Sequence, residues 1–597
     1  MNKKLIIGIV FIIFLGFMIF ILLNNFRVSP PSYVFNNDWL DKRNIYVFGT
    51  PPVESLKLVN ATGVSFSVYY GGLNSYDKEY LRELHQNGFK VSSNFPTIQA
   101  HITKNATLIE IAKCFDIEGN TLGFFGEQYS MCSENKEWKE FLKNRIKEHV
   151  DGEADAIQID EIGVNYDCFC EDSMKKFREY LANRYSTKEL HDIFGIDDIN
   201  SLDYRIYLLN NGAKNIWNDP NQNLLNEYFN FKYQDRVSFI KELIQYAREY
   251  ANRDILFSGN TYGFRPDQQI FIPYLDFLVF EMPIGSLPGG KLCTIYFLAE
   301  SLSPSKPIVG FPDIFDLAKI SEEDWWLWRH WLAEAYACGG SFLLPYNSYT
   351  FGGGSYSVPF ERLSDYTNFI TSHRDYYVNN SRVARVAILF DLNSTLINQA
   401  KWKAWEAWNS FLKIGYTLQE SHILFDVIYN GDGKFINKTA NLDDLKKYSI
   451  VIIPAYYDLS PEIEGLLNLY HQNGGLVLRL KEDMNVPELP RIIKNTNIDL
   501  GLRTNASNDI SIVAYKKGDS IILHFINYDY NNVTHKFIPK QLIEVEVSIP
   551  DSVNLSGKKL KLLTPDANEK IIEYKIQENK VKFVIPEIYE YMIVFFG

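Results

Sequence analysis

The chain has 597 residues, a formal net charge of −13 and a hydrophobic content of 46%. This length is too great for a single core and predicts roughly three or four domains with ordinary packed interiors. The excess of acidic residues disfavours nucleic acid and anionic lipid headgroups as partners, because both carry negative charge.

The N-terminal segment predicts a membrane anchor. An unbroken apolar run from Leu5 to Leu23 is long enough to cross a bilayer. Lys3 and Lys4 precede this run, so the positive-inside rule places the N-terminus in the cytoplasm and the bulk of the chain outside the cell membrane. No small-x-small cleavage site follows the run, which favours an uncleaved single-pass anchor over a removed signal peptide.

The region from residue 41 to 378 has the pattern of a barrel. Strand-like runs alternate there with amphipathic helical segments, which is typical of parallel β/α units. Eight such runs are the number that closes a (β/α)8 barrel, and we predict this fold. The predicted strands are Ile45–Gly49, Val64–Tyr70, Phe89–Asn94, Ala156–Glu161, Ile255–Asn260, Phe277–Glu281, Pro307–Phe311 and Ser341–Pro345.

The stretch from Asp155 to Gly163 is the main functional candidate. It is a short apolar strand that ends in two adjacent carboxylates, Asp160 and Glu161. A (β/α)8 barrel presents its catalytic groups at the C-terminal ends of its strands. Neighbouring strand residues point to opposite faces, so the two carboxylates cannot be buried in the same way. The alternative is a strand end with two solvated acids.

Polar or aromatic side chains follow most of the other predicted strands. Because these strand ends meet at one face of a barrel, we expect their side chains to line a substrate pocket. They are Tyr69, Tyr70, Asn94, Asn260, Tyr262, Glu281, Asp313, Tyr346 and Asn347.

Three motifs in the barrel resemble those of glycoside hydrolase family 42, the β-galactosidases. They are Ile159-Asp-Glu-Ile-Gly163, Cys168-Phe-Cys170 and the helical stretch from Lys176 to Tyr185. The resemblance implies that Glu161 is the general acid/base of a glycoside hydrolase.

The chain departs from the family pattern at three positions. Asp160 stands where the family has Asn, and Ser173 stands where a further zinc-binding cysteine is expected. The seventh predicted strand, from Pro307 to Asp313, lacks the nucleophilic Glu of the family.

Glycosidic bond cleavage usually needs a protonated acid at the leaving oxygen and a second carboxylate that stabilises or traps the cation. Burial at a strand end and the neighbouring Asp160 charge are expected to raise the pKa of Glu161, which makes it the natural acid. Glu281 and Asp313 are the candidates for the second carboxylate. We prefer Glu281, because it ends an apolar strand and is expected to face the barrel mouth. An ion pair or a helix cap at the rim is the alternative for either.

Two other functions fit the same residues. Asp160 and Glu161 are similar to the Asp-Glu pair of N-acetylhexosaminidases, in which the 2-acetamido group of the substrate replaces the protein nucleophile. The missing family Glu also fits a barrel that has lost catalysis and binds glycans or acts as a scaffold of the cell envelope. All three functions have a carbohydrate partner, and none requires a cofactor.

Four cysteines, Cys114, Cys132, Cys168 and Cys170, lie close to the acidic strand in the sequence. Thiols at i and i+2 can bind one ion, and the four together would form a structural zinc site. Disulfides are the alternative in a chain outside the cell. The spacing does not place the remaining two cysteines, Cys293 and Cys338.

The last third of the chain differs from the barrel. Short apolar strands alternate with helices over 382–503, which predicts a doubly wound α/β sheet. This part resembles the flavodoxin- or amidotransferase-like trimerisation domain of family 42, which implies a homo-oligomer, specifically a trimer. It holds no cysteine nucleophile, so we expect a structural role. Alternating strands over 508–597 predict a β-sandwich. The predicted order is an anchor (1–24), a tether (25–40), the barrel (41–378), the α/β domain (382–503) and the sandwich (508–597).

Overall fold

The computed structural model describes part of the chain. The described residues are 44–67, 75–101, 106–124, 127–282, 290–346, 348–349, 355–396, 402–483, 485–550 and 553–597. Within these ranges, no helix combines the length and the apolar character that crossing a bilayer requires. The predicted anchor and tether lie outside the described residues and stay predictions.

Eight parallel strands form a closed barrel, as the sequence pattern predicts. They are β1 (Ile45–Gly49), β2 (Ala61–Ser67), β3 (Lys90–Pro96), β6 (Ala156–Asp160), β7 (Leu256–Tyr262), β8 (Phe277–Met282), β9 (Ile308–Pro312) and β10 (Ser341–Tyr346). The order around the barrel is β1-β10-β9-β8-β7-β6-β3-β2. β2 begins at Ala61 rather than at the predicted Val64, because its pairing with β1 already starts there.

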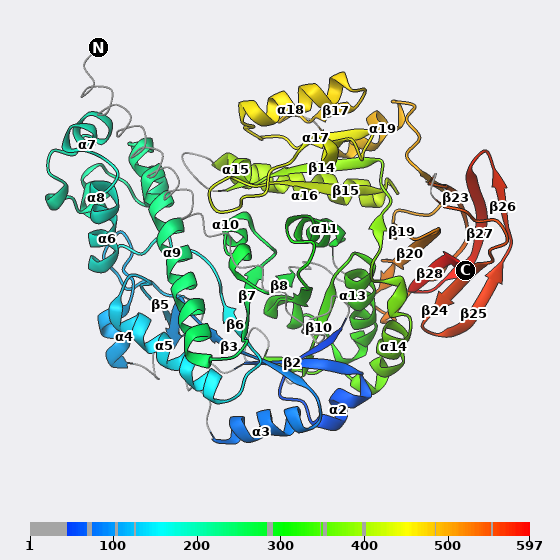
Figure 1. Ribbon diagram of the computed structural model, residues 1–597, viewed down its shortest axis with the longest axis horizontal. Helices are drawn as coiled ribbons and strands as arrows, with labels where there is room; N and C mark the ends of the chain where they lie inside the picture. Colours follow the sequence, from blue (N-terminus) through cyan, green and yellow to red (C-terminus); the bar gives the residue numbers. More distant parts are fainter. Residues whose placement is uncertain are drawn as a thin grey trace, which may run out of the picture. The chain divides into compact units, whose positions relative to one another are not determined.

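The helices between the strands cover the outside of the barrel (Figure 1). They include α2 (Val53–Leu58), α3 (Ser75–Gln86), α5 (Lys136–Asp151), α9 (Gln222–Ala251), α11 (Cys293–Leu302), α13 (Trp325–Ala337) and α14 (Phe360–Ser372). Asn135 caps the start of α5 by accepting a hydrogen bond from the Trp138 backbone nitrogen at 3.0 Å. Trp138, Leu142 and Ile146 then bury one helical stripe against the barrel.

The segment between β6 and β7 forms a helical insert. It contains α6 (Glu171–Ala182), α7 (Thr187–Phe194), α8 (Tyr204–Asn210) and the first half of α9. Three buried rings, those of Phe177, Tyr204 and Tyr228, hold these helices together with centroid distances of 4.8 to 5.3 Å. The loop from β6 to α6 carries two of the cysteines.

An α/β domain follows the barrel. Its parallel strands are β14 (Val386–Asp391), β15 (Phe425–Asn430), β16 (Ile450–Ile453) and β17 (Leu476–Arg479), in the order β15-β14-β16-β17. Helices α16 (Trp402–Glu420) and α18 (Pro461–Gln472) connect strands of this sheet. The hydroxyl of Tyr429 donates a buried hydrogen bond of 2.8 Å to Gln269 Oε1 of the barrel, which ties this domain to the segment after β7.

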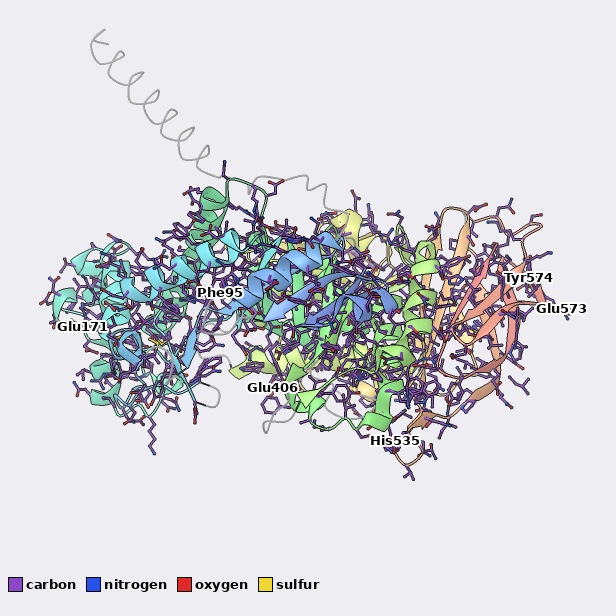
Figure 2. All side chains as sticks on the ribbon, turned by 90° about the horizontal axis from the view of Figure 1, so that it is seen from below. Phe95, Glu171, Glu406, His535, Glu573 and Tyr574 are labelled. Atoms are coloured by element: carbon purple, nitrogen blue, oxygen red, sulfur yellow. A yellow bond between two sulfur atoms is a disulfide. The ribbon has the colours of Figure 1, made fainter. Side chains whose placement is uncertain are left out.

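The C-terminal part is a β-sandwich, as predicted. One sheet contains β13 (Ser381–Arg382), β19 (Ile510–Lys517), β20 (Ser520–Asn527), β24 (Leu560–Thr564), β25 (Ala567–Ile572) and β28 (Tyr591–Phe596). The other contains β18 (Leu502–Thr504), β23 (Lys540–Ser548), β26 (Tyr574–Gln577) and β27 (Lys580–Ile588). Because β13 precedes the α/β domain in the chain, the sandwich takes strands from both sides of it. Tyr574 lies on β26, at the edge of the second sheet (Figure 2). Its hydroxyl donates to the carbonyl oxygen of Lys558 at 2.7 Å.

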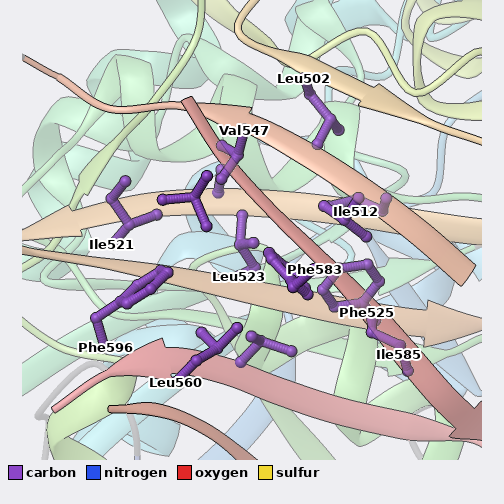
Figure 3. Close-up of a cluster of buried hydrophobic side chains, with 14 of the residues drawn as sticks. Leu502, Ile512, Ile521, Leu523, Phe525, Val547, Leu560, Phe583, Ile585 and Phe596 are labelled. Atoms are coloured by element: carbon purple, nitrogen blue, oxygen red, sulfur yellow. The ribbon is translucent and has the colours of Figure 1, made fainter. Parts of the chain in front are cut away.

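Alternating side chains form the core of the sandwich. Leu523 and Phe525 from the first sheet meet Val547, Phe583 and Ile585 from the second (Figure 3). On β27 the residues between the buried positions are exposed, which is the period of two expected for a sheet with one solvated face.

Candidate active site

Asp160 and Glu161 stand at the C-terminal end of β6, where the chain turns sharply. Asp160 is the last strand residue and is buried, whereas Glu161 is half-buried and has a positive φ of 50°. A side chain in this left-handed region is uncommon outside glycine, and such strain gathers at functional sites. The turn ends the regular alternation of the strand, so the two carboxylates have different environments, as predicted.

Asn260 of β7 joins the carboxylates of the two neighbouring strands. Its Nδ2 donates to Asp160 Oδ1 at 3.0 Å and to Glu281 Oε1, on β8, at 3.1 Å. The Oδ1 atom of Asn260 is buried and accepts no hydrogen bond from the described part of the chain. Since an unsatisfied buried acceptor is costly, this atom is suited to accept a hydrogen bond from a substrate hydroxyl.

The two glutamates have raised pKa values. Burial, the charge of Asp160 and the charge of Glu281 raise the pKa of Glu161 to about 8, against a smaller opposing effect of Arg265. Burial raises the pKa of Glu281 to about 7, with the hydrogen bond from Asn260 acting in the opposite direction and Asp160 and Asp313 adding to the rise. Glu281 therefore loses its proton before Glu161 does.

Asp313 is held at the rim of the barrel by contacts to both of its oxygens. Oδ2 accepts a hydrogen bond from the Tyr262 hydroxyl at 3.1 Å, and Oδ1 accepts one from the Asp316 backbone nitrogen at 2.7 Å. The second contact caps the short helix α12 (Ile314–Leu317). Both oxygens of Asp313 thus have donors, whereas Asn260 donates to one oxygen of Glu281, Oε1, and the preference for Glu281 stays a prediction.

The other predicted pocket residues have varied positions. Asn94 is buried on β3 and lies opposite Gln158, deeper in the barrel than the Pro96–Asp160 pair. Tyr346 is half-buried at the end of β10 and packs against the Phe360 ring at 5.8 Å. Tyr69, Tyr70 and Asn347 lie outside the described residues.

Arg265 belongs to this site but is absent from the sequence-based set. It follows β7 after Gly263 and Phe264, both of which have positive φ, of 60° and 57°. The Gly263 nitrogen donates to the Glu281 carbonyl oxygen at 2.7 Å, which holds this turn against the end of β8. In the sequence, the turn is indicated only by Gly263, which follows the polar residues at the end of β7.

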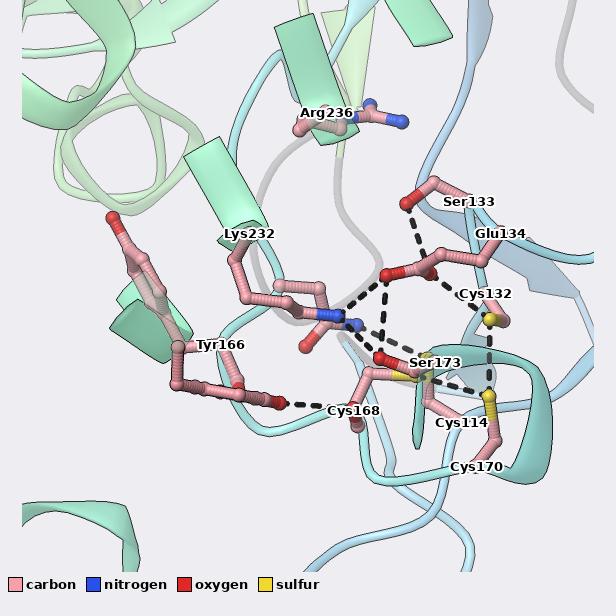
Figure 4. A network of polar contacts seen from close by, with 12 residues as sticks. Cys114, Cys132, Ser133, Glu134, Tyr166, Cys168, Cys170, Ser173, Lys232 and Arg236 are labelled. Carbon is pink, nitrogen blue, oxygen red and sulfur yellow. Dashed lines mark hydrogen bonds and ion pairs between the residues drawn. A yellow bond between two sulfur atoms is a disulfide. The ribbon is translucent and has the colours of Figure 1, made fainter. Parts of the chain in front are cut away.

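The four predicted cysteines come together beside the insert (Figure 4). Cys114 and Cys168 form a disulfide, whereas Cys132 and Cys170 are free thiols whose sulfurs are 3.0 Å apart. The sulfurs of Cys132, Cys168 and Cys170 all lie within 4.8 Å of one another, which fits the ligand spacing of one zinc ion. Zinc binding by all four would require the disulfide to be reduced, and it stays a prediction.

A buried ion pair lies against this cluster (Figure 4). Lys232 Nζ is 2.8 Å from Glu134 Oε1 and 2.9 Å from the Ser173 hydroxyl, and the thiol of Cys132 donates to Glu134 Oε2 at 3.0 Å. Ser173, at the position of the expected family cysteine, thus belongs to an ion-pair network. Elsewhere, a second disulfide joins Cys293 and Cys338, the pair that the spacing did not place.

No family model matches the chain. It is 26% identical to an alpha-agarase of Thalassotalea agarivorans over 275 residues, which cover 44% of this chain and 18% of that protein. It is 24% identical to an alpha-agarase of Alteromonas agarilytica over 441 residues, which cover 68% of this chain and 28% of that protein. The matched parts thus span less than a third of these curated relatives.

Solved structures share the fold over most of the chain. They include alpha-L-fucosidase isoenzyme 2 from Paenibacillus thiaminolyticus (TM-score 0.65, 12% identity, 93% of this chain and 99% of that chain). A beta-galactosidase from Rahnella sp. R3 has a TM-score of 0.64 and 13% identity over 93% of this chain and 99% of that chain. A beta-galactosidase from Marinomonas ef1 has a TM-score of 0.60 and 12% identity, covering 92% and 99%. The barrel, the α/β domain and the sandwich therefore form a known arrangement.

Proposed function

We propose that this protein is a glycoside hydrolase that uses Glu161 as the acid and Glu281 as the second carboxylate. The observation that carries the proposal is the meeting of carboxylates at one barrel mouth, where Asn260 donates to both Asp160 and Glu281 and burial raises the pKa values of Glu161 and Glu281. Midway between these pKa values, most Glu161 carboxyl groups are protonated while most Glu281 carboxyl groups are ionised, and these are the two states that glycosidic bond cleavage needs.

The residues act in a defined order. Glu161 gives its proton to the glycosidic oxygen as the bond from this oxygen to the anomeric carbon breaks. The Glu281 carboxylate stabilises the positive charge that develops on the sugar ring. Water then adds to the anomeric carbon, and one of the two carboxylates takes up the proton that this water releases. Asn260 holds Glu281 and Asp160 through one amide nitrogen, and its free Oδ1 is placed to accept a hydrogen bond from a sugar hydroxyl.

The comparisons suggest the substrate class. Both curated relatives are named alpha-agarases, and two of the structures with the same fold are named beta-galactosidases. We therefore propose a galactose-containing polysaccharide, with agarose as the first candidate. The substrate-assisted and non-catalytic alternatives have less support, because a second carboxylate with a raised pKa is present beside Glu161.

The proposal includes the location and assembly inferred from the sequence. The chain is proposed to be anchored by its N-terminal apolar run with its bulk outside the cell. Labelling of engineered cysteines on intact cells tests this, since sites after Asn24 should react and sites before Lys4 should not. Labelling of the barrel only after lysis would reverse the orientation. A trimer, suggested by the family resemblance, is tested by light scattering of the detergent-solubilised protein.

The decisive experiment compares two variants of the full-length protein on agarose, galactans and aryl galactosides. Glu161→Gln should lose hydrolysis of the polysaccharides by orders of magnitude but keep substrates whose leaving group needs no proton. Glu281→Gln should lose both kinds, because no leaving group compensates for an unstabilised cation.

The matched control is Glu171→Gln, a change at an exposed glutamate at the start of α6 in the insert (Figure 2). This variant should behave as the wild type. The proposed function would be contradicted if the wild type and Glu161→Gln hydrolysed unactivated substrates equally well. It would also be contradicted if the wild type hydrolysed no glycoside.

A further inference from the structure

A tryptophan of the α/β domain meets an arginine of the barrel mouth. The Arg265 guanidinium lies over the ring of Trp405, with its central carbon 5.9 Å from the ring centroid. Trp405 is in the first turns of α16 and remains 36% exposed. Its helix neighbours Ala404, Ala407 and Trp408 are buried, so the helix has a core-facing stripe that does not include Trp405.

The backbone holds Arg265 close to the glutamates. Phe264, the preceding residue, is fully buried and packs against the Phe280 ring of β8 at 5.4 Å, which fixes the left-handed turn. Arg265 then stands at the N-cap position of α10 (Pro266–Gln269) without a side-chain capping hydrogen bond, and Gln269 of this helix accepts the hydrogen bond from Tyr429. The same short segment therefore contacts the end of β8 on one side and the α/β domain on the other.

Arg265 has N–H groups that are available to donate further hydrogen bonds. In the described part of the chain, the contacts of Arg265 to an acid are both to Asp267 and both long, 3.4 Å from Nε to Oδ1 and 3.5 Å from Nη2 to Oδ2. A guanidinium carries five N–H donors, and 35% of this side chain is exposed. Its positive charge also acts on Glu161, which places it near the proton that the reaction uses.

We infer that Trp405 and Arg265 form a sugar-binding subsite that holds a unit of the polysaccharide beyond the cleaved bond. The face of Trp405 that Arg265 does not cover would stack on the apolar C–H face of a sugar ring, and Arg265 would donate hydrogen bonds to oxygens of the adjoining sugar unit. The inference rests on the proposed function and adds to it that the α/β domain takes part in substrate binding. Binding energy from such a remote unit is used at the reacting centre, so catalysis should improve with chain length.

The test compares Trp405→Ala with the wild type on agarose oligosaccharides of increasing length and on an aryl galactoside. The loss in kcat/KM should grow with oligosaccharide length and should exceed the loss on the aryl galactoside by roughly 10-fold. Trp405→Phe should retain most of the kcat/KM that Trp405→Ala loses, because phenylalanine keeps an aromatic face. The matched control is Trp217→Ala, at a half-buried tryptophan of the insert. Any loss in kcat/KM of this variant should not depend on the length of the oligosaccharide.

A second readout separates this inference from the proposed function. Calorimetric binding of agarose oligosaccharides to Glu161→Gln should weaken roughly 10-fold when Trp405→Ala is added, whether or not the wild type cleaves them. Hydrolysis without any dependence on Trp405 would overturn the subsite and leave the glutamate assignment intact. An equal loss on short and long substrates would also overturn it, since it would indicate a general structural defect.

Discussion

Glu161 and Glu281 stand at the ends of two barrel strands separated by β7, and they differ in the pH at which they ionise. Burial is the main cause of the rise in both pKa values, to about 8 for Glu161 and about 7 for Glu281. Because Glu281 ionises first, its negative charge then opposes the ionisation of Glu161. Between these two pKa values, the site thus contains a protonated Glu161 and an ionised Glu281.

The first prediction concerns pH. Below about pH 7 Glu281 is protonated, and above about pH 8 Glu161 has lost its proton, so kcat/KM should follow a bell with its maximum between these values. Arg265 lowers the pKa of Glu161, so Arg265→Gln should move the basic limb to higher pH. The exposed Arg503→Gln serves as the control and should leave the profile unchanged. A basic limb that stays in place in Arg265→Gln would contradict the assignment of Glu161.

A second prediction concerns the amide between the acids. Asn260→Ala removes the hydrogen bond that lowers the pKa of Glu281, so the pKa of Glu281 should rise. The acid limb of the kcat/KM profile should then move to higher pH, and the rate at its optimum should fall as well. Asn120→Ala, at an exposed residue in the segment between β3 and β6, is a matched change that should affect neither. An unmoved acid limb would show that Glu281 is not the group that titrates there.

The third prediction addresses the cysteines. Alkylation of the denatured protein without a reductant, followed by peptide mass spectrometry, should modify Cys132 and Cys170 and leave Cys114–Cys168 and Cys293–Cys338 linked. About one zinc per chain, with all four clustered cysteines alkylated and the barrel destabilised by a chelator, would establish the metal site instead.

The last prediction tests the buried ion pair. Lys232 and Glu134 have side chains only 3% and 1% exposed, so Lys232→Met leaves a buried carboxylate without its cation. This should cost about 3–5 kcal/mol and lower the calorimetric unfolding midpoint, whereas adding Glu134→Gln should restore part of the loss. Lys176→Met breaks an exposed pair with Glu179 and should change stability by less than about 1 kcal/mol. Equal effects of the two lysine changes would contradict this account.

Local sequence patterns were sufficient to predict the barrel and the set of clustered cysteines. Apolar runs and their period are local properties, so all eight barrel strands could be located without any knowledge of their partners. A strand that ends in Asp160 and Glu161 has to present them at the barrel mouth. The preference for Glu281 followed from the same reasoning, because its strand is apolar up to that residue.

Which of these groups meet depends on contacts between distant parts of the chain. The hydrogen bonds of Asn260 to Asp160 and Glu281 join residues of three different strands, 100 and 21 positions apart. The disulfide pairing and the contact of Arg265 with Trp405 join separate segments in the same way. Such contacts depend on how the barrel closes and on how the α/β domain packs against it, and no local pattern of side chains records either.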